Sequence, residues 1–150
     1  MDILEFYGSL PIDPGTDPID LDVLDGYYLA APDSFWRYLE DDQSAAVNGC
    51  GPKHLGDFLV PDTVWGLSVK PACKIHDWMY TVYNSEAGFK LSNQVFLDNM
   101  LRINASTKNK FLRWLRTRRI MKYYRMVNTF GRLFFYDAHV SLYNSGEIYR

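Results

Sequence analysis

Apolar residues recur at helical spacing over three stretches in the second half of this 150-residue chain. The spacing predicts one helix over residues 70–84, a second over "NQVFLDNMLRIN" with Ser92 as its cap, and a third over about residues 109–127. Residues 86–88, "EAG", would separate the first two helices. Strand signal is weak outside the end of the chain, "HVSLYNSGEIYR". The pattern therefore predicts a mainly α fold.

The first 45 residues differ from the rest in both pattern and charge. Residues 8–26 are rich in Pro, Gly and Asp, which indicates an extended arm with turns, and a short helix should follow in "APDSFWRYLEDD". Residues 1–45 contain 11 Asp and Glu against a single Arg, whereas the remaining residues contain 15 Lys and Arg against 7 Asp and Glu. We therefore predict an acidic arm over residues 1–45 and a helical domain over residues 46–150.

Two patterns that direct proteins to membranes are not found in the sequence. Its apolar runs are shorter than the roughly 18 residues of a spanning helix. Its first residues, "MDILEFYGSLPIDPG", lack the basic start and apolar middle of a signal peptide. We therefore expect neither a transmembrane segment nor an export signal, and the compartment stays open.

Between Val47 and Val69 the helical periodicity disappears, and four Gly and two Pro occur within 23 residues. This composition predicts a structured loop. Gly49 and Gly51 would let the backbone approach a ligand closely, because glycine has no side chain to hold it away. Carbonyl oxygens from such a loop, together with a carboxylate, form the hard oxygen site that Ca²⁺ prefers.

The helix predicted over residues 70–84 carries a polar stripe. Cys73, His76, Asp77 and Tyr80 follow one another at steps of three, one and three residues, so they share one side of the helix. A core histidine that is hydrogen-bonded to a neighbour is the simplest interpretation of His76 alone. A stripe that stays polar for two turns needs hydrogen-bonding partners or a cation. Asn93 lies on the apolar side of the next helix and is a candidate partner.

Four segments in this order resemble the phospholipase A2 superfamily: "NGCGP", "CKIHDWMY", "SNQVFLDNM" and "YYRMVNTFG". The similarity is to short phospholipase A2-like proteins of bacteria and phages, and it covers about residues 46–135. The resemblance implies two antiparallel helices carrying a His-Asp site, preceded by a calcium-type loop and followed by a basic C-terminal helix. It also implies calcium-dependent hydrolysis of a glycerophospholipid ester.

The resemblance assigns roles to residues of the loop and of the first helix. His76 matches the general base that takes a proton from the attacking water. Asp77 matches the carboxylate ligand of Ca²⁺, and the main-chain oxygens of Val47, Gly49 and Gly51 complete the ligand set. The main-chain N–H of Gly49 would help Ca²⁺ to stabilise the oxyanion that forms on the ester.

The second helix departs from the family at one position. Asn93 stands where the family has the aspartate that holds the histidine, and Tyr80 matches the tyrosine that steadies this partner. An asparagine carbonyl can accept the imidazole N–H, but it cannot stabilise the imidazolium by charge. The resemblance also makes a disulfide between Cys50 and Cys73 plausible.

Two other functions remain open at this point. Cys50, His54, Cys73 and His76 have spacings that suit a closed tetrahedral zinc site, which would make the protein a zinc-stabilised binding module. Alternatively, the scaffold could be non-catalytic and serve as an assembly component, for example of a phage particle, with the arm of residues 1–45 along a neighbouring subunit.

A basic and aromatic segment, residues 108–125, predicts a further contact surface. Its mixture of cations and aromatic rings suits an anionic phospholipid surface, which we rank ahead of nucleic acid. It also suits the acidic arm of a neighbouring copy, or a solvated face that balances the chain's own arm. The basic residues are Lys108, Lys110, Arg113, Arg116, Arg118, Arg119, Lys122 and Arg125.

Overall fold

A computed structural model of the chain describes residues 10–41 and 61–145. Helices dominate these residues: α2 (Asp33–Asp41), α5 (Lys70–Val82), α6 (Glu86–Asn104) and α7 (Lys110–Ser145). A single-turn 3₁₀ helix, η1 (Pro14–Thr16), precedes two antiparallel hairpins, β1 (Ile19–Leu24) with β2 (Tyr27–Pro32) and β3 (Thr63–Val64) with β4 (Leu67–Ser68). The prediction of a mainly α fold is confirmed over the described residues.

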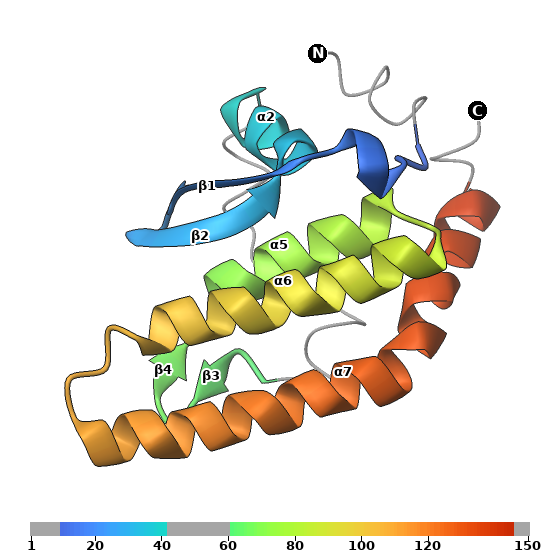
Figure 1. Cartoon of the computed structure of the whole chain (residues 1–150). Coiled ribbons are helices and arrows are strands. Elements are labelled where there is room, and N and C mark those ends of the chain that lie inside the picture. Colours follow the sequence, from blue (N-terminus) through green and yellow to red (C-terminus); the bar gives the residue numbers. More distant parts are fainter. Residues whose placement is uncertain (1–9, 42–60, 146–150) are drawn as a thin grey trace.

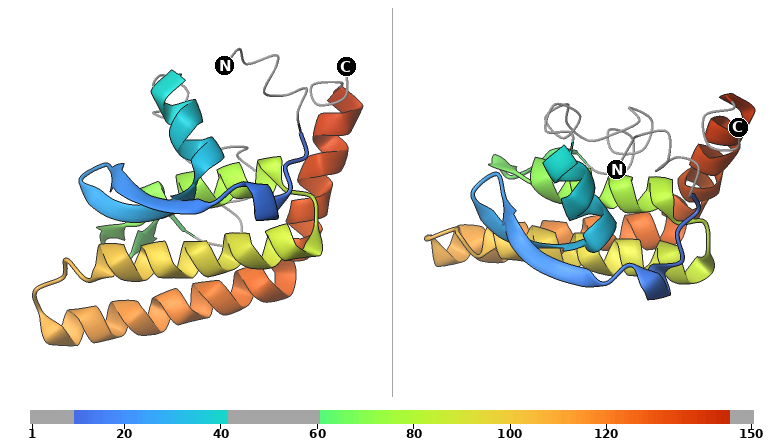
Figure 2. Two further views of the ribbon diagram at one scale, coloured as in Figure 1. Left: turned by 45° about the horizontal axis from the view of Figure 1, so that its top comes forward. Right: turned by 90° about the horizontal axis from the view of Figure 1, so that it is seen from above.

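Helix α6 lies at the centre of the arrangement. It runs antiparallel to α5, packs against β2 with another part of its surface, and packs against α7 on the side away from the hairpin (Figure 1). In the left view of Figure 2 the β1–β2 hairpin and the first half of α7 lie on different sides of α6. None of the described helices combines the length and the apolar character needed to span a membrane.

Helix α6 begins earlier than the sequence predicted. Ser85, not Ser92, is its N-cap, and the Ser85 hydroxyl accepts a hydrogen bond from the N–H of Gly88 at 3.0 Å. Ser92 is buried inside the helix and donates to the carbonyl of Gly88. Gly88 does not separate the helices but lies within α6. A glycine is required there, because a Cβ at this position would come 2.5 Å from the Cβ of Tyr83.

Helix α7 continues well past the predicted end at residue 127. It runs to Ser145, so the Val- and Tyr-rich tail is mostly helical, and the weak strand signal there was wrong up to that residue. The buried side chains Ile120, Tyr123 and Val127 recur at steps of three and four residues, which turns one side of α7 toward α6.

The last part of the predicted arm, residues 19–26, forms the first strand and the turn of a β-hairpin, and this corrects the interpretation of that part. β1 pairs with β2 from Ile19 opposite Pro32 to Leu24 opposite Tyr27. Asp25 and Gly26 form the two-residue turn, and both have positive φ angles, 51° and 84°. The alternation of apolar residues with Asp in "IDLDVL", followed by Asp-Gly, is the signal that the sequence analysis missed.

Two buried polar side chains attach this hairpin to the helices. The amide of Asn99 on α6 pairs with the backbone of Ala30, accepting from its N–H at 2.8 Å and donating to its carbonyl at 2.7 Å. The carboxylate of Asp17 accepts hydrogen bonds from the N–H and hydroxyl of Ser34 and from the hydroxyl of Tyr83. Residues 10–41 are therefore fastened to α6 and α5 by buried hydrogen bonds.

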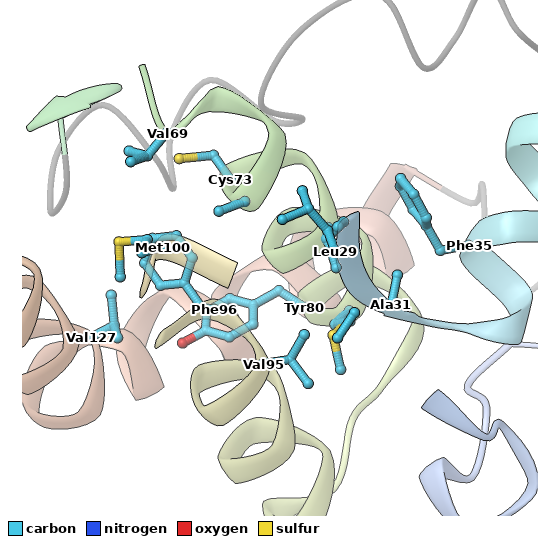
Figure 3. Close-up of a cluster of buried hydrophobic side chains, with 14 of the residues drawn as sticks. Leu29, Ala31, Phe35, Val69, Cys73, Tyr80, Val95, Phe96, Met100 and Val127 are labelled. Atoms are coloured by element: carbon cyan, nitrogen blue, oxygen red, sulfur yellow. The ribbon is translucent and has the colours of Figure 1, made fainter. Parts of the chain in front are cut away.

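One apolar core serves both predicted units. Leu29 and Phe35 come from the N-terminal part, and Phe96, Met100 and Val127 come from α6 and α7 (Figure 3). All five side chains are buried. The described parts of the predicted arm and of the predicted helical domain thus contribute to the same core.

Candidate active site

Helix α5 turns the polar stripe toward the interior. Pro71 stands at the start of the helix, where its missing N–H leaves no hydrogen bond unmade. Three turns of helix then bring His76, Asp77 and Tyr80 to positions that are only 8 %, 3 % and 1 % exposed. Because such polar side chains are costly to bury without partners, their partners decide what the stripe can do.

Asn93 on α6 is the partner that holds two of these side chains. Its Oδ1 lies 2.9 Å from Nε2 of His76 and accepts a hydrogen bond from the hydroxyl of Tyr80 at 2.7 Å. The helical pattern predicts that Asn93 lies on the inward side of its helix and is a candidate partner of His76. The side chain is fully buried and does contact the histidine, so this part of the prediction is confirmed.

The contact with Asn93 fixes the tautomer of the imidazole. An amide oxygen is only an acceptor, so the Nε2 atom that faces it must carry the proton. Neutral His76 therefore keeps a lone pair on Nδ1. A histidine with Nε2 tethered and Nδ1 unprotonated has the form that general-base catalysis needs.

Burial keeps this imidazole neutral. Loss of hydration lowers the pKa of His76 to about 4, and the hydrogen bond with Asn93 opposes that effect only in part. Burial also raises the pKa of Tyr80, with a smaller raising effect from the charge of Asp77, so its hydroxyl stays protonated and donates. At neutral pH the network therefore consists of an uncharged base, a neutral amide and a neutral phenol.

Aromatic rings surround the imidazole on two sides. Phe96 stacks on it with ring centroids 4.3 Å apart and an angle of 23° between the planes, and the Tyr80 ring centroid is 4.1 Å away. Phe135 on α7 meets the Tyr80 ring edge-on at 5.1 Å. These contacts restrict the rotation of the histidine and remove water from around its ring, which explains the lowered pKa.

Helix α7 supplies two residues to the site to which the sequence analysis gave no role. Asn128 accepts a hydrogen bond on its Oδ1 from Nδ2 of Asn93 at 3.0 Å. Gly131 lies over the hydroxyl of Tyr80, and a Cβ at this position would be only 2.6 Å from that oxygen. Gly131 could have been noticed as a lone glycine in an apolar helical run. No local pattern marks Asn128, which is 35 residues from its partner.

The predicted calcium loop lies outside the described residues. Val47, Gly49 and Gly51, three of the four proposed ligand residues, belong to it, and only Asp77 is described. Asp77 is buried directly beside His76 on α5. A buried carboxylate is a hard oxygen donor and suits Ca²⁺. Within residues 10–41 and 61–145, His, Cys, Asp and Glu form no group of three or more that could hold a metal ion.

The zinc and disulfide interpretations also depend on residues outside the described part of the chain. Cys50 and His54 are not described, so neither the zinc site nor the pairing of Cys50 with Cys73 is tested. Cys73 itself is buried near the start of α5, one turn before His76. Both interpretations stay predictions.

Comparison of the chain with protein-family models, with curated proteins and with solved structures gives no match.

Proposed function

We propose that the protein hydrolyses an ester bond of a glycerophospholipid with the help of Ca²⁺, and that His76 is the general base. The observation that carries the proposal is the double use of Asn93 Oδ1, which accepts from both His76 and Tyr80. Two residues one helical turn apart on α5 are thereby joined to one residue on α6.

In the proposed reaction, Nδ1 of His76 takes a proton from a water molecule as the oxygen of that water attacks the ester carbonyl. Asn93 and Tyr80 keep the ring oriented, and Phe96 limits its rotation. The proton then passes from His76 to the departing alcohol oxygen. Asn93 cannot balance the charge of the transient imidazolium, so we expect slow turnover.

The proposal includes one metal ion. Asp77 and the main-chain oxygens of Val47, Gly49 and Gly51 would hold Ca²⁺, and Ca²⁺ would polarise the ester carbonyl and stabilise its developing negative charge. The buried carboxylate of Asp77, next to the base in the sequence, is the described feature that supports this assignment.

Glycerophospholipids assemble into a membrane surface. The basic segment of residues 108–125 is the part of the protein that would contact this surface. None of its eight basic side chains forms an ion pair with another of the described residues. Phe111 and Trp114 are 68 % and 50 % exposed on the same helix. Cations with exposed aromatic rings favour an anionic lipid surface.

The experiment is a fatty-acid release assay on mixed anionic phospholipid vesicles, with Ca²⁺ or with a calcium chelator. We expect slow release that requires Ca²⁺ and is lost in His76→Gln, while Gln94→Ala, an exposed change beside Asn93, leaves it unchanged. Circular dichroism would show that each variant is folded. Release that persists in folded His76→Gln contradicts the proposed base, and one tightly bound zinc per chain contradicts the calcium assignment.

A second candidate function is that of a non-catalytic assembly component. The exposed apolar strand β1 favours it, because Ile19, Leu21 and Val23 are 36 %, 43 % and 59 % exposed. Absence of release from the wild type and from Asn93→Asp, under conditions in which both proteins bind Ca²⁺, would favour this second function over the first.

A further inference from the structure

The β3–β4 hairpin presents a tryptophan at its turn. Trp65 and Gly66 are the two turn residues, and their φ angles, 47° and 78°, are both positive. Asparagine and glycine usually occupy such a turn, because a bulky side chain is strained at a positive φ angle. Trp65 is 52 % exposed, so burial of its ring does not offset this strain. A strained residue of this kind is a reason to look for a function.

Helix α7 holds this turn in place (Figure 1). The guanidinium of Arg116 donates to the carbonyl oxygen of Trp65 from Nη2 at 2.8 Å and from Nε at 3.3 Å. The guanidinium of Arg119 lies 5.2 Å from the centroid of the Trp65 ring. The hydroxyl of Tyr123 donates to the carbonyl of Thr63 on β3 at 3.3 Å. The turn is therefore fastened to the basic helix, while its indole ring stays half exposed.

A second tryptophan is paired with an arginine of α7 in the same way. The guanidinium of Arg118 lies 5.1 Å from the centroid of the Trp114 ring, and Trp114 is 50 % exposed. Arg118 and Arg119 are adjacent in the chain, but their aromatic partners come from different elements. Trp114 belongs to α7, whereas Trp65 belongs to the hairpin.

The two pairs flank the basic side of α7. Successive residues of a helix are separated by 100°, so Trp114 and Arg119 lie about 140° apart around the helix axis. Lys122 lies between them, about 80° from Trp114 and about 60° from Arg119. Phe111 and Arg118 fall within the same arc. The exposed side of α7 therefore has a tryptophan along each of its two edges.

The surroundings of Trp65 favour an anionic partner. The sequence contains no acidic residue between Asp98 and Asp137. The acidic residue of the hairpin segment, Asp62, stands at the base, where its carbonyl accepts from the N–H of Val69. An indole ring is apolar with one polar N–H, and such rings lie at the level of the lipid headgroups in membrane proteins. An exposed tryptophan between cations thus suits the surface of an anionic membrane.

We propose that Trp65 is a membrane anchor, whose ring enters the headgroup region of an anionic phospholipid bilayer together with the ring of Trp114. A single helix that lies on a membrane can roll about its own axis. Two rings on opposite edges of its exposed side permit only one roll angle. The inference rests on the lipid contact proposed for residues 108–125 and adds to it a residue from another element.

The orientation of α7 also determines the orientation of the candidate active site. Asn128 follows Arg125 by one turn on the same helix and accepts a hydrogen bond from Asn93, which holds His76. The hydrogen-bond network of the site is thus joined to the helix that would lie on the membrane. Trp65 is a positioning residue in this scheme, because it contacts the membrane and not the reacting atoms.

The first test is co-sedimentation with vesicles of equimolar phosphatidylcholine and phosphatidylglycerol, in ether-linked forms that cannot be hydrolysed. Trp65→Asn keeps the carbonyl that Arg116 binds and introduces a residue that tolerates a positive φ angle. We expect an unchanged or higher urea midpoint, but an affinity for vesicles about tenfold or more below that of the wild type. Trp65→Tyr, which restores a ring, should regain part of the affinity. Tyr28→Thr, which removes a ring of similar exposure on β2, is the control and should bind normally.

The second test locates the ring itself. The chain has four tryptophans, and labelling with fluorotryptophan gives each a ¹⁹F resonance that single substitutions assign. On bicelles of the same lipids, a nitroxide attached to the lipid headgroup should broaden the resonances of Trp65 and Trp114. The resonances of Trp36 on α2 and Trp78 on α5 should stay sharp.

Three results would overturn the anchor: normal vesicle binding by folded Trp65→Asn, a loss of binding that goes with a lower urea midpoint, or a sharp Trp65 resonance in the bound protein. A wild type that does not bind these vesicles overturns both the anchor and the lipid contact. The fatty-acid release assay separates the anchor from the proposed function. Release with a sharp Trp65 resonance retains hydrolysis and removes the anchor, whereas a broadened Trp65 resonance without release retains the anchor and removes hydrolysis.

Discussion

Asn93 and Asn128 are joined amide to amide across the interface of α6 and α7, with Nδ2 of Asn93 donating to Oδ1 of Asn128 at 3.0 Å. This bond supports the orientation of the Asn93 amide in which its oxygen faces His76 and Tyr80. A residue on a third helix thereby helps to set the tautomer of the histidine.

Asn128→Ala should release the Asn93 amide and allow it to rotate. With Nδ2 turned toward His76, the proton of the imidazole would move from Nε2 to Nδ1, and the base would be lost. We expect the ¹⁵N resonances of His76 to report a single tautomer in the wild type and a mixture in Asn128→Ala. Asn128→Asp, which still accepts from Asn93, should preserve the single tautomer, as should the exposed neighbouring change Thr129→Ala.

Asn93→Asp should raise the pKa of His76 above its present value of about 4. A carboxylate beside the ring favours the imidazolium, and such pairs commonly shift a pKa by about 1–3 units. A proton titration of the His76 ring followed by NMR measures the change. If the proposed function is correct, the variant should also release fatty acid faster. An unchanged pKa would mean that the new aspartate is itself protonated.

His76 should make the stability of the protein depend on pH on the acidic side of neutrality. Its folded-state pKa, about 4, is below the unfolded value of 6.5, so the unfolded chain binds the proton more tightly. Neutral His76 contributes about 3 kcal/mol to the free energy of unfolding. This contribution is complete above pH 6.5 and is lost as the pH falls toward 4. Urea unfolding at several pH values should show this loss, and it should be reduced in His76→Gln.

Gly131→Ala should strain the contact between α7 and Tyr80. The added methyl group would approach the Tyr80 hydroxyl to 2.6 Å, so the helix or the tyrosine must move, at a cost of about 1–3 kcal/mol. In a protein that already carries Tyr80→Phe and so lacks this hydroxyl, Gly131→Ala should reduce the free energy of unfolding much less. Urea denaturation of the two single variants and the double variant measures the coupling, and strictly additive effects would contradict the contact.

Asn99→Ala should loosen the hairpin by removing both hydrogen bonds to Ala30. Two buried backbone groups would then have no partner, at a cost of about 1–3 kcal/mol each. Hydrogen exchange at the N–H of Ala30 should accelerate strongly. Exchange within α5 should change much less, which would separate local detachment from global unfolding.

The local part of the site could be predicted from the sequence, because it depends on spacing within one helix. The stripe of His76, Asp77 and Tyr80 and the inward position of Asn93 follow from helical periodicity. The contributions of Asn128 and Gly131 could not be predicted in this way. They depend on how α7 crosses α6, and that crossing results from packing between segments some 35 residues apart.

The N-terminal part was predicted less well for a different reason. Pro, Gly and Asp dominate residues 8–26, and their turn propensity concealed the period of two in β1. The start of α6 was missed because Gly88 is normally a helix breaker, whereas here its missing side chain makes room for Tyr83. Tertiary contacts outweighed local propensity in both places.

The hydrogen bonds between Asn99 and Ala30 join residues 69 positions apart in the chain. A two-stranded hairpin is at best marginally stable alone in water, so this one becomes stable only after α6 is in place. During synthesis the hairpin leaves the ribosome before α6, yet it must wait for the residues that fix it. The order in which the protein is made therefore differs from the order in which its parts become stable.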